Sequence, residues 1–255
     1  MNNISVINED DNFENLLKNI DLLIQSGNFD EALKTCIKLE VDFSHAPSLN
    51  FKIALIYKNL GNLNLAIKYY TKVLDNKPDE PNALNNLGNI LNHNNQPEQA
   101  STLFFKVILL MPNAPQPYAN LSHSYNLMEK FDDAINYGLK ALELNPKFIQ
   151  AYEYVSNAQY SLGLYNEAIS TITKAINIDD NNSTLLKTFI SLLPKIKSSE
   201  YNSSLDEVIG KVLKKNLISS DTISDLLSRI ESHPDIDYLI CHLNNDNYFS
   251  NDLPN

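Results

Sequence analysis

The residues best able to do chemistry in this chain are its histidines and cysteines. His93 and His123 occupy similar places in neighbouring segments, and a metal ion between two imidazoles is conceivable; histidines that serve as hydrogen-bond partners are far commoner, and we expect that role here. Cys241 and His242 are adjacent but lack the third, orienting residue of a nucleophilic site. The sequence contains no HExxH, GxSxG or glycine-rich phosphate loop. We therefore expect no catalysis, no cofactor and no metal.

Charge and cysteine usage argue against several further classes of function. The chain has 255 residues and a formal net charge of −11, which is unfavourable for binding nucleic acid or an anionic membrane. No apolar run is long enough to span a bilayer, and the N-terminus does not resemble a secretory signal. Cys36 and Cys241 are far apart, without a CxxC motif, which is typical of a reduced protein. We expect a cytoplasmic location, and we expect Cys36 to lie in the core.

Small residues recur through most of the chain with a period of 34 residues. One column contains only alanine, at Ala32, Ala66, Ala100, Ala134 and Ala168. A second contains Ala54, Gly88, Ser122 and Ser156. A third contains Gly27, Gly61, Asn95 and Gly163. Prolines follow at Pro78, Pro112 and Pro146. The columns divide the chain into five repeats, at residues 13–46, 47–80, 81–114, 115–148 and 149–182.

Each repeat has the pattern of two amphipathic helices. In the third repeat Leu84, Leu87 and Leu91 have helical spacing, and a second apolar stripe follows over residues 103–108. The glycine or asparagine column supplies the backbone that ends the first helix. The alanine column marks a close helix approach, where a larger side chain should cost ~1–3 kcal/mol. Each hairpin leaves an apolar side for its neighbour to cover, so the repeats should stack.

These columns resemble those of the tetratricopeptide repeat family over about two thirds of the chain. The resemblance implies an all-α fold, a right-handed α-solenoid of five helix hairpins. Residues 1–12 are expected to form a disordered lead-in, and residues 183–255 an atypical helical cap. An alternative for 183–255 is a loose resemblance to the helical segment that joins repeat arrays to a transferase domain in some bacterial fusion proteins. Gly138 departs from the family, which usually has an aromatic residue there.

The resemblance also implies where a partner would bind. In this family the first helices line the concave face, through the second, fifth, sixth, ninth, twelfth and thirteenth positions of each repeat. In repeats three to five this wall is rich in amides and aromatics and nearly uncharged, and asparagine can bond a peptide backbone without reading its sequence. The candidate partner-binding residues are Asn82, Asn85, Asn86, Asn89, His93, Asn120, His123, Tyr154 and Asn157.

The wall is loosely similar to the asparagine ladder in the repeat domain of protein O-GlcNAc transferases; the alternative is that an asparagine-rich chain collects this residue on its helix surfaces by default. It does not resemble the carboxylate clamp that binds chaperone C-termini, because Asn85, Gln150 and Tyr154 stand where that clamp has cations. We expect a scaffold that binds a protein or extended peptide, with its oligomeric state open. The alternative is a targeting module for a SAM-dependent methyltransferase or a glycosyltransferase whose catalytic domain is absent here.

Overall fold

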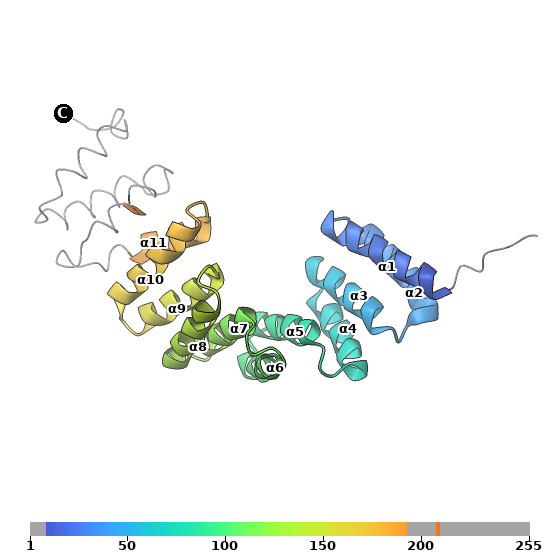
Figure 1. Ribbon diagram of the computed structural model, residues 1–255, viewed down its shortest axis with the longest axis horizontal. Helices are drawn as coiled ribbons and strands as arrows, with labels where there is room; N and C mark the ends of the chain where they lie inside the picture. Colours follow the sequence, from blue (N-terminus) through green and yellow to red (C-terminus); the bar gives the residue numbers. More distant parts are fainter. Residues whose placement is uncertain (1–8, 193–207, 210–255) are drawn as a thin grey trace, which may run out of the picture. The chain divides into compact units, whose positions relative to one another are not determined.

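The computed structural model describes residues 9–192 and 208–209, and the ordered elements in this part of the chain are all helices (Figure 1). Ten of them form five consecutive hairpins. The hairpins are α1 (Glu9–Gln25) with α2 (Phe29–Phe43), α3 (Pro47–Asn59) with α4 (Leu63–Asn76), α5 (Pro81–His93) with α6 (Pro97–Leu110), α7 (Pro115–Leu127) with α8 (Phe131–Leu144), and α9 (Ile149–Ser161) with α10 (Tyr165–Ile178). A further helix, α11 (Ser183–Leu192), follows them. The expected all-α class and the phase of the five repeats are confirmed.

Proline marks both ends of the repeats. Pro47, Pro81 and Pro115 stand in the first turn of their helices, where a missing N–H costs no helical hydrogen bond. At the other end, α4 and α6 stop just before Pro78 and Pro112, because proline cannot continue a helix. The boundaries before Pro81 and Pro115 therefore carry both local signals, whereas the boundary before Pro47 carries only the first.

The turn inside each hairpin uses a left-handed residue. Gly27, Gly61 and Gly163 have φ of 77°, 76° and 75°, while Asn95 and Glu129 occupy the same column with φ of 57°. After α3 the Gly61 N–H donates to the Lys58 carbonyl at 3.1 Å, and the next N–H reaches back five residues. These two hydrogen bonds pair with carbonyl groups that have no partner within the helix. The column was expected, but its fourth member, Glu129, was not recognised.

The small-residue columns lie where the helices of a hairpin meet. All five alanines of the alanine column are fully buried. A Cβ added at Gly88 would lie 2.6 Å from a ring carbon of Phe104, so only glycine fits there. At Gly138 an added Cβ would lie 2.3 Å from Val155 Cγ2, and this close approach explains why the aromatic residue usual in the family is missing. The close helix approach is seen directly at Gly88, and the burial of the five alanines agrees with the approach predicted for their column.

Two compact bodies make up the chain, Met1–Asn113 and Ala114–Asn255. In the N-terminal body, α2 packs on α3, and α4 packs on α5. Large side chains such as Leu49, Ile53 and Tyr70 fill its core, and Cys36 lies among them with no exposed surface. Burial raises the pKa of the Cys36 thiol to about 12, and the predicted core position of this residue is confirmed. In the C-terminal body, α8 packs on α9 and α10 packs on α11.

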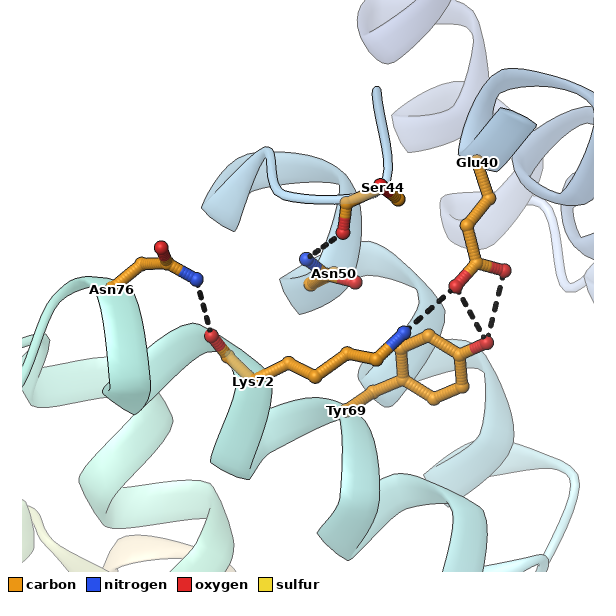
Figure 2. Close-up of polar contacts among 6 residues, drawn as sticks. All are labelled: Glu40, Ser44, Asn50, Tyr69, Lys72 and Asn76. Carbon is orange, nitrogen blue, oxygen red and sulfur yellow. Dashed lines mark hydrogen bonds and ion pairs between the residues drawn. The ribbon is translucent and has the colours of Figure 1, made fainter. Parts of the chain in front are cut away.

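A polar network joins the first and second repeats on their second helices (Figure 2). The Glu40 carboxylate accepts hydrogen bonds from the Tyr69 hydroxyl at 3.0 Å and from Lys72 Nζ at 2.9 Å. Burial would raise the pKa of Glu40, but these two donors outweigh it and hold the pKa below its ordinary value. Nearby, Asn50 Nδ2 donates to the Ser44 carbonyl at 2.9 Å and ties the loop after α2 to α3. The repeats are thus joined by polar contacts as well as by the core.

The ends differ in part from expectation. Helix α1 begins at Glu9, so residues 9–12 are helical rather than part of a disordered lead-in; they contain neither glycine nor proline, and nothing in them interrupts a helix. At the other end, α11 buries Leu185, Leu186 and Phe189. The cap expected over 183–255 is therefore helical and packed through residue 192. Residues 193–207 and 210–255 of the expected cap lie outside the described residues. No helix in the described ranges has the length and apolar character needed to span a membrane.

Candidate partner-binding face

The first helices of neighbouring repeats lie side by side and form what we call the first-helix face. In the N-terminal body this face is made by α1, α3 and α5; α1 contacts α3, and Lys58 on α3 bonds to α5. Lys58 Nζ donates to Asn86 Oδ1 at 2.8 Å, and Asn86 Nδ2 donates to the Asn82 carbonyl at 2.9 Å. Burial lowers the pKa of Lys58. Asn86 is therefore held in one orientation by its neighbours.

A second polar contact joins α1 to α3. Lys52 forms an ion pair with Asp21, and its side chain is only 14% exposed. The two cations of α3 thus both face this surface, although α3 lies outside repeats three to five, for which the inner wall was predicted. Applying the same positions to the second repeat would have found them, because Lys52 and Lys58 are its sixth and twelfth residues.

An open cavity of about 240 Å³ lies at the start of α3 and α5. Its lining includes Phe51, with Ser48 and Lys52 beside it on α3 and Asn82 on α5. These four residues are at the second, fifth and sixth positions of their repeats, which were expected to point inward. The other lining residues come from the end of α4 and the loop after it: Val73, Lys77 and Glu80, with Pro47 at the start of α3.

In the C-terminal body the face is made by α7 and α9, which are in contact. The rings of His123 and Tyr154 are stacked with their centroids 4.7 Å apart and their planes 4° from parallel. Asn126 Nδ2 donates to the Tyr154 carbonyl at 2.8 Å. Burial lowers the pKa of His123 and raises that of Tyr154. Burial thus favours the neutral imidazole, which lies flat against the phenol.

Glu153 also lies on this part of the face, immediately before Tyr154. It is half-buried, and no cation donates to its carboxylate within the described ranges. Burial raises the pKa of Glu153. The expectation of a nearly uncharged wall therefore needs one qualification, because this single carboxylate is partly withdrawn from water.

The same pairs of positions meet in both bodies. The residue at the ninth position of one repeat contacts the residue at the sixth position of the next. Asp21 contacts Lys52 in this way, and His123 contacts Tyr154. The residue at the twelfth position also bonds to the sixth position of the next repeat. Lys58 donates to Asn86, and Asn126 donates to the Tyr154 carbonyl. The sixth position is therefore the point at which adjacent first helices are joined.

The other candidate residues differ in how much surface they expose. Asn82, His93 and Asn157 are exposed, and Asn89 and Asn120 are partly buried. Asn85, in contrast, is only 8% exposed, so little of its amide can meet a partner. His93 and Asn86 lie in one body, whereas His123 and Asn120 lie in the other. An asparagine ladder through both bodies, and any pairing of the two histidines, stay predictions.

The described residues bring together no group of three or more histidine, cysteine, aspartate or glutamate side chains that could hold a metal ion. Cys241 and His242, considered above for nucleophilic chemistry, lie outside the described residues. The chemistry of the face is therefore that of amides, aromatic rings and a few charges, which suits non-covalent binding.

Comparison with known proteins agrees with this geometry. A tetratricopeptide repeat profile matches residues 47–80, 115–148 and 149–182, and a second profile of the same description matches 69–100. No curated protein matches the chain.

Solved structures resemble the chain in fold. PilW, described as a widely conserved type IV pilus biogenesis factor, is 16% identical with a TM-score of 0.70, over 84% of this chain and 97% of that one. The pilF structure from Pseudomonas aeruginosa is 19% identical with a TM-score of 0.67, over 84% and 96%. MamA from Desulfovibrio magneticus RS-1 is 20% identical with a TM-score of 0.60, over 66% and 96%. With its five hairpins in one phase and its profile matches over residues 47–100 and 115–182, the chain contains tetratricopeptide repeats.

Proposed function

We propose that the protein is a scaffold whose first-helix face binds an extended segment of a protein partner. The observation that carries this proposal is the cavity between α3 and α5, because half of its lining residues occupy the positions expected to meet a ligand. Its volume of about 240 Å³ is below the range of small-molecule sites and is suited to a single side chain. A segment lying along the face could place one side chain there.

Free amides on the first helices support the same function. The side chains of Asn82, Asn89 and Asn157 have no hydrogen-bond partner among the described residues. Each amide offers two donors and an acceptor to a peptide backbone. An extended segment needs such groups, since its own N–H and C=O groups lose water when it binds.

The test fills the cavity from its rim. Asn82 is exposed and its side chain makes no hydrogen bond to the described residues, so Asn82→Trp should place an indole in the cavity without disturbing the core. The matched control is Asn64→Trp, an exposed asparagine on α4 outside the cavity lining. Both variants should keep the wild-type melting temperature.

The probe is a phage-displayed dodecapeptide library selected on the full chain, with affinities measured by fluorescence polarisation. We expect the wild type and Asn64→Trp to bind the selected peptides equally, and Asn82→Trp to bind them at least about tenfold more weakly, the equivalent of ~1.4 kcal/mol. Selection of no peptide by the wild type, or unchanged affinity in Asn82→Trp, would contradict the proposal.

A further inference from the structure

The carboxylate of Glu153 has no cationic partner among the described residues. It is half-buried on α9, and burial raises its pKa, with no nearby cation acting in the opposite direction. A carboxylate withdrawn from water is costly unless a cation or hydrogen-bond donors compensate. The structure therefore contains an anionic site that a bound cation would stabilise.

The rings beside Glu153 form a surface that suits one kind of cation. Glu153 directly precedes Tyr154 on α9, and its charge contributes to the raised pKa of Tyr154. Tyr154 in turn stacks on His123 at 4.7 Å. Aromatic faces attract cations, and a planar guanidinium can stack on them while it bonds a carboxylate.

No charge on the same helices competes for Glu153. Helix α7 carries no aspartate, glutamate, lysine or arginine, and Glu153 is the one such residue on α9. Burial lowers the pKa of His123, which favours its uncharged form. Lys187 on α11 is exposed and forms no ion pair with Glu153. The formal charge of −11 on the whole chain also favours a basic ligand.

We infer that Glu153, with the stacked rings of Tyr154 and His123, receives a basic side chain of the bound segment, with arginine preferred over lysine. This inference rests on the proposed function, because it names the chemistry of the partner that the first-helix face binds. The guanidinium donates to the carboxylate and lies against the exposed part of the ring stack.

The test compares peptide selection by the wild type, Glu153→Gln and a matched control. Glu167→Gln is that control, since Glu167 is an exposed residue of the same body on the second helix α10 and its replacement removes the same charge. Phage-displayed dodecapeptides selected on the full chain should be enriched in arginine for the wild type and Glu167→Gln. For Glu153→Gln the enrichment should disappear while peptides are still selected.

Defined peptides then measure the size of the effect. Replacing the selected arginine by citrulline, its neutral isostere, should weaken binding to the wild type by about tenfold or more, as expected for a charge-assisted hydrogen bond. The same replacement should change binding to Glu153→Gln by less than about twofold. Tyr154→Leu should reduce the preference for arginine over lysine, and Tyr154→Phe should keep it.

The outcomes separate the two proposals. Peptides selected without a basic preference, or with one that Glu153→Gln retains, would overturn the inference and leave the scaffold function standing. A library that yields no binding peptide at all would overturn both. Loss of arginine enrichment in Glu167→Gln as well would overturn the inference, because net charge rather than this site would then explain the preference.

Discussion

Replacing Glu129 by glycine should stabilise the fold, although glycine usually destabilises a helical protein. Glu129 has φ of 57° in the turn between α7 and α8, where three of the other four repeats have glycine with φ of 75° to 77°. A side chain in this left-handed conformation costs about 1–2 kcal/mol. Glycine adds freedom to the unfolded chain, which takes back about 0.4–1 kcal/mol. The net expected gain is about 1 kcal/mol, or about 2–4 °C in melting temperature.

The reverse change provides a calibration. At Gly61 an added Cβ would meet no atom within 4 Å, so Gly61→Ala tests the cost of backbone conformation without a steric clash. It should lower the free energy of unfolding by about 1 kcal/mol. Glu129→Asn should fall between Glu129 and glycine, because asparagine tolerates this region better than most residues and Asn95 fills the same column.

The assay is thermal and urea unfolding followed by circular dichroism at neutral pH. Glu129→Gln is the matched control, since it removes the charge but keeps the Cβ, and its stability should match that of the wild type. Equal stability of Glu129→Gly and Glu129→Gln would refute the reasoning. A neutral effect of Gly61→Ala would refute it independently.

Two further predictions concern close packing and the Glu40 network. Gly138→Ala should cost about 1–3 kcal/mol in the free energy of unfolding, because its Cβ would lie 2.3 Å from Val155 Cγ2, and Val155→Ala should restore much of this loss in a double-mutant cycle followed by urea unfolding. The lowered pKa of Glu40 means that its carboxylate stabilises the fold above the unfolded-state pKa of about 4.3 and that this contribution is lost as pH falls through the folded-state pKa. Glu40→Gln should therefore have a lower urea midpoint than the wild type near pH 7, and the difference should shrink near pH 3; a gap that is constant with pH would contradict this.

Sequence periodicity is enough to predict the hairpins of this fold. The alanine column carries the information because helices that approach closely exclude larger side chains, so Ala66 or Ala134 cannot vary freely. A local sequence signal is weaker where a residue other than glycine adopts the left-handed conformation. Glu129 adopts the glycine conformation without glycine, and the turn is held in place by the helices on either side of it. The extension of α1 to Glu9 likewise has no repeat column to mark it.

The candidate face was predicted less completely than the fold. Its positions follow from the repeat, yet whether an amide is free or occupied depends on the residue opposite it in the next repeat. Asn86 and Asn82 look equivalent in sequence, but only Asn86 has Lys58 within reach. The importance of Glu153 depends on the absence of a nearby cation, which becomes visible only in three dimensions.

The contacts at the sixth position of each repeat have a consequence for how such an array can evolve or be redesigned. Tyr154 faces the proposed ligand but also stacks on His123 of the preceding repeat, just as Lys52 is paired with Asp21 of the preceding repeat. A repeat that is duplicated or grafted as a single block brings its own sixth residue but leaves the complementary residues behind. Changes of specificity should therefore be inherited as pairs that straddle a repeat boundary. Block exchange should work best when the cut falls inside a repeat, between its sixth and ninth positions, because each pair then stays within one block.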